Sequence, residues 1–399
     1  MRARTSKGFL LAGALAVLVR VLRPLVLIRI VRFHPAFGNV LRSPMYYLLL
    51  REHEKLEGVR RSFDIAFWVG QTPSSDLARF WSRQVRLVQD PMPRLFTKIL
   101  TVVSWYWLRD KRMDRHVIDL TLPHQMVSEE LNTSRYSAAR SMTHSETFDV
   151  QLCLRNLGVE SGRPYALIHV RNSCHDLRTS RTYEGRLNDA DPSSFQKAVD
   201  LLVGIGYSVI TFGNDPSSPS GLRGVIEYHS SSERTPLRDF TLASTAALYI
   251  GTAAGAPSGA AINFRIPILL TNWLAPNAKV TIEPFDYGRS VVVPKNIRSS
   301  GTPWSFSETL SRRFPDTDSG LAIEGIGVED NHEDDILAAL IELLALAKGE
   351  TKWQESRSRH DQLAFYRVFD EHSKLARRCP QESAVISPSF LQKYPHWLR

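Results

Sequence analysis

The residues best suited to chemistry follow a short apolar run that ends at His169, Val170 and Arg171. His169 and Arg171 are two residues apart, so on an extended strand their side chains lie on the same face. A guanidinium at a strand end can bind a phosphate or a carboxylate with two parallel hydrogen bonds. The segment that follows is rich in titratable side chains, namely His175, Asp176, Arg178, Arg181, Glu184 and Arg186. We expect it to fold over an anionic ligand; the alternative is a solvated loop whose charges contact only water.

Two more loops are expected at the carboxyl ends of strands, the edge at which open α/β sheets bind ligands. The first contains Gly213 and Asn214, directly after the apolar strand "YSVITF". A glycine at a strand end lets a backbone approach a ligand closely, although an ordinary turn would also explain it. Asp239, which we expect to start the helix "DFTLASTA", is placed to face the same edge.

The other loop, "GTAAGAPSGAAINF", begins at Gly251 and is rich in small residues. We expect a helix to begin near Pro257, because proline is favoured at the first helical position. Thr252, Gly255 and Ser258 would then surround a helix amino terminus, whose backbone N–H groups bind anions. The alternative is tight packing of small side chains without a ligand.

Metal and dinucleotide motifs find little support in the sequence. "DAD" (residues 189–191) and "DTD" (residues 316–318) match the DxD pattern of metal-dependent sugar transferases. However, Asp191 precedes "PSSF" and is expected to cap a helix, while "FPDTDSG" is typical of a turn. The glycines carry no P-loop lysine, and no glycine fingerprint follows a first strand. The three scattered cysteines suggest neither zinc nor disulfides. We therefore expect no metal, and a reducing, cytoplasmic location.

The amino-terminal segment is basic and apolar at once. Residues 1–32 contain seven basic side chains and no acidic one, which accounts for most of the formal net charge of +9. The uninterrupted apolar run, residues 8–19, is shorter than the roughly 20 residues that span a bilayer. Arg20, Arg23, Arg29 and Arg32 would form one cationic flank of a helix broken near Pro24. We expect residues 1–33 to be an anchor at an anionic membrane surface. The alternative is a first core helix of the amino-terminal domain.

The remaining chain alternates strands and helices, which indicates an α/β fold with parallel sheets. The series restarts at Pro164, so we place a domain boundary near residues 158–164. The expected architecture has a doubly wound domain over residues 34–160 and a second one over residues 161–348. A helical tail over residues 349–399 ends in the irregular "ISPSFLQKYPHWLR".

With these residues in view, the chain resembles a bacterial family of glycosyltransferases found with surface-polysaccharide genes. The resemblance rests on "DIAFWVG", "ALIHVRNSCHD", "YSVITFGN", "LRDFTLASTAALYIGTAAGAPSGAAINF", "VPKN" and "ISPSFL". It implies the GT-B arrangement, in which two Rossmann-like domains flank a cleft and the second one holds the donor. A looser similarity to GT-B fucosyltransferases, whose H-x-R motif contacts a diphosphate, implies that role for His169 and Arg171. This chain departs from those relatives at Asn172 and at residues 253–254 (Ala-Ala).

The resemblance implies transfer of a sugar from a nucleoside-diphosphate sugar to a glycan or lipid-linked acceptor, without a metal or a further cofactor. The expected catalytic residues are His169, Arg171, His175, Asp176 and Glu184. The expected donor-binding residues are Arg171, Arg186, Gly213, Asn214, Asp239, Gly251, Thr252, Gly255 and Ser258.

Two other readings stay open. One is a non-catalytic nucleotide-sugar-binding or scaffolding subunit, which the departures at Asn172 and the Ala-Ala pair favour. The other, a Rossmann oxidoreductase, lacks the glycine fingerprint that it requires. The expected partners are a nucleotide sugar, the acceptor and an anionic membrane, with no nucleic acid. The expected location is the cytoplasmic face of the inner membrane.

Overall fold

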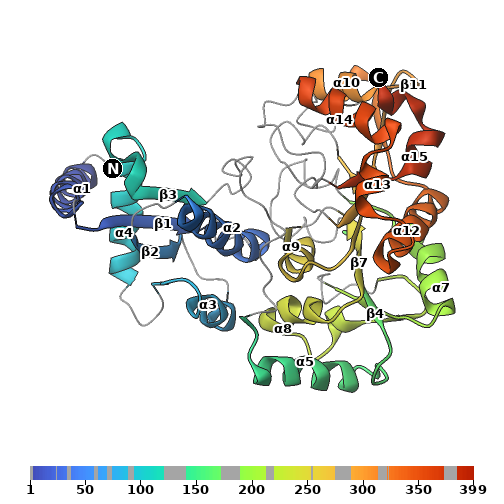
Figure 1. Cartoon of the computed structure of the whole chain (residues 1–399), viewed down its shortest axis with the longest axis horizontal. Helices are drawn as coiled ribbons and strands as arrows, with labels where there is room; N and C mark the ends of the chain where they lie inside the picture. Colours follow the sequence, from blue (N-terminus) through green and yellow to red (C-terminus); the bar gives the residue numbers. More distant parts are fainter. Residues whose placement is uncertain are drawn as a thin grey trace. The chain divides into compact units, whose positions relative to one another are not determined.

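A computed structural model of the chain divides into two compact units, Met1–Tyr136 and Ser137–Arg399 (Figure 1). The structure describes residues 3–23, 25–33, 37–57, 62–69, 74–88, 94–120, 141–171, 189–212, 220–252, 255–274, 289–312, 321, 323–372 and 384–399. Within these ranges, no helix is both long and apolar enough to cross a membrane.

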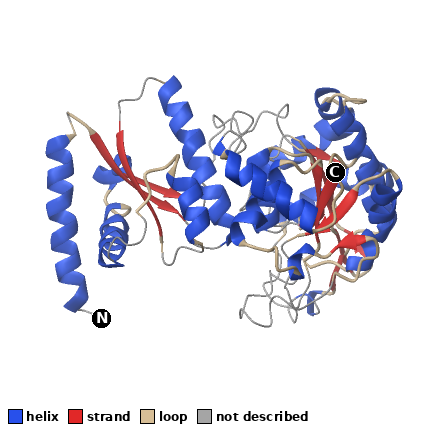
Figure 2. Ribbon diagram, turned by 90° about the horizontal axis from the view of Figure 1, so that it is seen from below, coloured by secondary structure: helices blue, strands red, loops and turns tan. Residues whose placement is uncertain are grey.

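The first unit is built on a three-stranded parallel sheet in the order β2-β1-β3. Its strands are β1 (Leu27–Phe33), β2 (Ser62–Trp68) and β3 (Val117–Leu120). Helices α1 (Ala3–Leu22) and α4 (Arg94–Trp107) pack on one face of this sheet, and α2 (Phe37–Leu56) packs on the other (Figure 2). Helix α3 (Ser75–Ser82) and the 3-10 turn η1 (Lys111–His116) complete the unit.

The expected anchor is wrong in its second half, because β1 is the central strand of the first sheet. Arg29 is buried, and it donates hydrogen bonds to Asp64 from Nε (2.8 Å) and Nη2 (2.7 Å) and to Glu54 from Nη2 (2.9 Å). Burial alone would raise the pKa of Asp64, but the hydrogen bonds from Arg29 and Tyr47 lower it below its ordinary value. The spacing of the arginines alone suggested one flank of a helix. Glu54 and Asp64, which pair with Arg29, lie 25 and 35 residues away in the sequence, so no local pattern indicated this pairing.

The second unit is built on a seven-stranded parallel sheet in the order β13-β9-β8-β7-β4-β5-β6. Its strands are β4 (Tyr165–His169), β5 (Ser208–Thr211), β6 (Val225–Ile226), β7 (Leu248–Thr252), β8 (Ile268–Trp273), β9 (Ser290–Pro294) and β13 (Val385–Ile386). Parallel strands need crossover helices, which cover both faces of such a sheet. The α/β class with parallel sheets is confirmed.

Helices lie on both faces of this sheet (Figure 1). One face carries α7 (Gln196–Gly204) and α12 (Glu333–Lys348), and the other carries α5 (His144–Asn156), α8 (Pro236–Thr241) and α9 (Gly255–Phe264). A small antiparallel sheet joins β11 (Thr302–Pro303), β10 (Asn296–Ser299) and β12 (Ile326–Glu329). The remaining elements are α10 (Phe306–Ser311), α13 (Trp353–Arg357), α14 (His360–His372), α15 (Pro388–Lys393) and the 3-10 turns η6 (Pro192–Phe195), η7 (Tyr228–Ser230), η8 (Leu242–Ser244) and η11 (Pro395–Leu398).

The units divide before the expected boundary of residues 158–164. Helix α5 accounts for the difference, because its Asp149 accepts hydrogen bonds from Arg238 of α8 at 2.8 and 2.7 Å. The last residues also differ from the expected irregular tail. Strand β13 pairs with β9, and the buried Trp397 donates to Asn296 Oδ1 (3.0 Å). The carboxyl terminus is thus part of the core of the second unit.

Candidate functional site

The order of strands in the second unit marks one place on its sheet. From β4 the chain proceeds outward through β5 and β6, then returns to the other side of β4 and proceeds outward through β7, β8 and β9. The order therefore reverses between β4 and β7, which pair in parallel with His169 opposite Gly251. Ligands of open α/β sheets bind beyond the carboxyl ends of the strands at such a switch point. The loops that begin at His169 and Gly251 leave the sheet here.

Arg171 lies directly above this point and is held there by contacts of its backbone and its side chain. Its backbone N–H donates to Thr252 Oγ1 (3.1 Å), which joins the ends of β4 and β7. Its Nε lies 3.2 Å from Asp189 Oδ1, and both side chains are largely buried. The N–H of Ala190 also donates to the carbonyl oxygen of Arg171 (2.9 Å). The guanidinium is thereby fixed at the edge of the sheet.

Asp189 is a member of this site that the sequence did not reveal. Its carboxylate pairs with Arg171, and its backbone carbonyl accepts a hydrogen bond from Lys295 Nζ (2.7 Å). Lys295 is buried and also pairs with Asp330 (2.6 Å). The only local signal was the DxD pattern, which we discounted as a metal motif. Asp189 pairs instead with the guanidinium of Arg171.

The other half of that pattern behaves as expected. Asp191 caps η6 and accepts a hydrogen bond from the backbone N–H of Ser193 (2.9 Å), so the predicted cap is confirmed. Among the residues that the structure describes, no three His, Cys, Asp or Glu side chains gather where a metal ion could bind. Residues 316–318 lie outside the described ranges.

His169 is buried at the end of β4 and connects it to β5. Its Nδ1 lies 2.7 Å from the carbonyl oxygen of Phe212. A carbonyl oxygen can only accept, so Nδ1 carries a proton, and the lone pair of the neutral form of the ring would be on Nε2. This contact fixes the ring plane; the expected contact with a diphosphate stays a prediction.

Gly251 and Thr252 have roles in packing the two strands together. A Cβ atom on Gly251 would lie 2.3 Å from the carbonyl oxygen of His169, so the close approach of β4 and β7 requires glycine. Thr252 is fully buried and uses its hydroxyl to accept from Arg171. Tight packing between the strands, without a ligand, thus explains Gly251 and Thr252. Contacts with a ligand would then come from the first turn of the helix that follows them.

Helix α9 begins at Gly255, slightly before the expected start near Pro257, and Ser258 lies in its first turn. Because the helix follows the carboxyl end of β7, its amino terminus is on the same edge of the sheet as Arg171. The N–H groups of a first helical turn have no intrahelical acceptor and favour anions. The edge therefore combines a guanidinium with a helix amino terminus.

Asp239 does not start its helix, in contrast to our expectation. Helix α8 begins at Pro236 after the cap Thr235, and Asp239 lies in its first turn. Its carboxylate is buried and accepts from Arg234 Nε (3.1 and 3.3 Å). Burial raises the pKa of Asp239 above its ordinary value. The pair with Arg234 gives Asp239 a structural role, and a ligand contact stays a prediction.

Six of the expected site residues fall outside the described ranges. They are His175, Asp176, Glu184, Arg186, Gly213 and Asn214.

Strand β8 adds a feature at the same edge that the sequence analysis missed. Asn272 adopts a left-handed backbone (φ 52°), which asparagine tolerates better than most residues. Asn272 and Asn331 are both buried, and each donates its backbone N–H to the side-chain oxygen of the other, at 2.6 and 2.8 Å. The local signal was a threonine and an asparagine, residues 271–272, directly after an apolar run. Left-handed residues other than glycine tend to occur at functional sites, and this one lies at the irregular carboxyl end of β8, on the same edge as Arg171.

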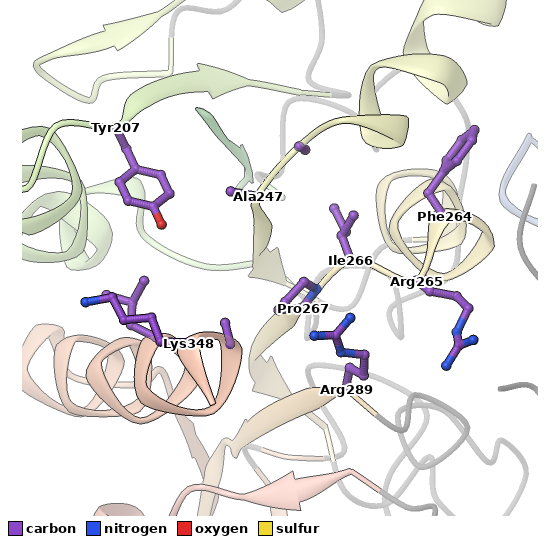
Figure 3. Close-up of a pocket in the computed structure, with 11 residues that line it drawn as sticks. Tyr207, Ala247, Phe264, Arg265, Ile266, Pro267, Arg289 and Lys348 are labelled. Atoms are coloured by element: carbon purple, nitrogen blue, oxygen red, sulfur yellow. The ribbon is translucent and has the colours of Figure 1, made fainter. Parts of the chain in front are cut away.

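A pocket lies at the opposite edge of the sheet (Figure 3). It is open to solvent, has a volume of about 430 Å³ and lies at the amino ends of β5, β7, β8 and β9. The residues that line it are Tyr207, Ala246, Ala247, Phe264, Arg265, Ile266, Pro267, Arg289, Leu344, Ala347 and Lys348. Figure 3 shows Lys348 and Arg265 on opposite sides of it. Because parallel sheets bind ligands at their carboxyl ends, we assign the site to the edge with Arg171.

Comparisons with known proteins find similar solved structures, all at low sequence identity. No family model and no curated protein matches the chain. Solved structures similar to it include a glycosyl transferase of family 9 from Veillonella parvula, with 11% identity over 79% of this chain and 96% of its own and a TM-score of 0.46. E. coli ADP-heptose LPS heptosyltransferase II has 12% identity, coverages of 81% and 99% and a TM-score of 0.42. Similarities of this size establish neither a family nor an activity for the chain.

Proposed function

We propose that the chain is a glycosyltransferase that moves a sugar from a nucleoside-diphosphate sugar to a glycan or lipid-linked acceptor in surface-polysaccharide synthesis. The observation that carries the proposal is that Arg171 and the start of α9 lie at the same edge of the parallel sheet, beyond the switch point between β4 and β7. Both features bind anions, and a diphosphate needs such partners along its length. The donor would be used without a metal, at the cytoplasmic face of the inner membrane.

The chemistry follows from the charge that develops during transfer. When the bond between the sugar and the diphosphate breaks, the leaving diphosphate gains negative charge. Preorganised donors lower the barrier because they need no reorientation at that moment, and one such donor contributes on the order of 3 kcal/mol. Arg171 is held in place by Asp189, and the amides of α9 are fixed by the helix, so both meet this requirement.

An acceptor hydroxyl must lose its proton as it attacks the sugar. His175, Asp176 and Glu184 are the proposed general bases, because they follow Arg171 in the sequence and carry groups that can accept a proton. His169, whose Nδ1 is engaged by Phe212, would orient the donor with the other side of its ring.

The test of the proposed reaction is release of nucleoside diphosphate from sugar nucleotides. The full chain is incubated with UDP-, GDP- and CDP-sugars, with and without a chelator, and free nucleoside diphosphate is measured. We expect nucleoside diphosphate to be released slowly from one class of sugar nucleotide, because water replaces the missing acceptor. The chelator should not change this release, and Arg171→Ala should abolish it. Binding of a sugar nucleotide without release, in the presence of candidate glycan acceptors, would favour the non-catalytic subunit instead.

A further inference from the structure

Helix α1 presents an apolar face that no described residue covers. Leu10, Val17, Leu18 and Val21 are 70%, 60%, 52% and 68% exposed. Together with the exposed Leu11, Gly13 and Ala14, they form one continuous side of the helix without a charged residue. An exposed contiguous apolar surface usually marks an interaction site.

The opposite side of α1 belongs to the core of the first unit. Ala12 and Val19 are buried against α4 and β1 in a cluster that includes Trp107. The indole N–H of Trp107 donates to the carbonyl oxygen of Ala12 (3.1 Å). The helix is therefore held along its length by the folded unit, and a partner can reach only its outer face.

Basic residues flank this face at the carboxyl end of α1. Arg23 is exposed, and Arg20 lies 3.7 Å from Asp110, just before the turn η1. That turn exposes Lys111, Arg112 and Arg115. In the sequence, Arg4 and Lys7 lie in the first two turns of α1, and residues 1–32 contain no acidic residue.

We propose that the outer face of α1 docks on the surface of an anionic lipid bilayer. The apolar side chains would enter the boundary between headgroups and acyl chains, and the basic residues at the helix ends would contact anionic headgroups. The folded unit holds α1 by its inner face, so the helix lies along the surface. Of the four arginines first assigned to a cationic flank, Arg23 is exposed, and Arg20 is partly exposed and shares Asp110 with Arg112. Arg29 and Arg32 are paired with carboxylates inside the unit.

The experiment is sedimentation of the full chain with vesicles. One set contains phosphatidylcholine alone, and the other an equal mixture of phosphatidylcholine and phosphatidylglycerol. We expect binding to the anionic set, weakened by salt. The double variant Val17→Glu/Val21→Glu should bind roughly tenfold more weakly, because it places two negative charges on the outer face that would enter the bilayer. Arg23→Glu should lose at least about fivefold, since each basic residue near such a surface contributes roughly that factor.

The matched control is Ile341→Glu, which changes a 53% exposed apolar residue on α12 in the second unit and should leave vesicle binding unchanged. Thermal unfolding of each variant shows whether it is folded. Failure of the wild type to bind anionic vesicles, or equal binding by the α1 variants, would overturn the proposal. So would a concentration-dependent dimer in solution that Val17→Glu/Val21→Glu abolishes, because a second copy would then cover this face.

Discussion

At the scale of single residues, the site depends on how Arg171 is positioned. Its guanidinium contacts Asp189, and its backbone is bonded to Thr252 and Ala190. A flexible arginine would lose rotamer entropy on binding an anion, whereas one that is already held loses less. Asp189 is therefore a positioning residue that acts through Arg171.

Substitution of Asp189 tests this role. Asp189→Asn keeps the size of the side chain but removes the negative charge that pairs with the Arg171 guanidinium. We expect nucleoside diphosphate to bind roughly tenfold or more weakly. The temperature of unfolding should also fall, because Arg171 loses its partner in a largely buried ion pair. Calorimetric titration measures the first quantity and thermal denaturation the second. Unchanged affinity in a folded variant would show that Asp189 does not position Arg171.

At the scale of elements, local signals predicted the caps and the strands well. Asp191 caps η6, as its place before "PSSF" indicated. The strands expected in the run that ends at His169, in "YSVITF" and before the loop at Gly251 are confirmed as β4, β5 and β7. The sequence failed where partners are distant: Arg29 has its carboxylates 25 and 35 residues away, and β13 pairs with β9.

The pairing of β4 and β7 gives a sharp prediction for Gly251. Gly251→Ala would place a Cβ atom 2.3 Å from the carbonyl oxygen of His169, so the strands must separate. We expect the free energy of unfolding to fall by about 3 kcal/mol, the upper range for overpacked positions. Denaturant unfolding measures the change. Gly204→Ala is the control, because nothing lies within 4 Å of the added atom; equal stability of the two variants would contradict the observed strand spacing.

The assignment of β1 to the core predicts the effect of removing Arg29. Arg29→Ala leaves the buried Asp64 without its main cation, and breaking a buried ion pair costs about 3–5 kcal/mol. We expect the first unit to unfold at a markedly lower denaturant concentration. Arg23→Ala, at an exposed position, should leave the transition unchanged. A stable Arg29→Ala protein with impaired vesicle binding would restore the original view of Arg29 as part of the anchor.

At the scale of the whole molecule, the sequence predicted the α/β class and the two loops that the sheet of the second unit brings together. His169 and Gly251 are far apart in the chain, but each ends a run that reads as a buried parallel strand. Their adjacency depends on strand order, which no local pattern specifies. The same limit hid Asp189 and Lys295, whose importance comes from partners in other parts of the chain.

The central claim is that a nucleoside diphosphate binds at the carboxyl edge of the seven-stranded sheet. The most direct measurement is calorimetric titration of the full chain with UDP, GDP and CDP, beside two arginine variants. Arg171→Ala changes the carboxyl edge, and Arg289→Ala changes the pocket at the amino edge. We predict that one nucleotide binds to the wild type and to Arg289→Ala, and that Arg171→Ala loses this binding while it remains folded. Binding that survives Arg171→Ala and is lost in Arg289→Ala, or no binding by the folded wild type, would contradict the claim.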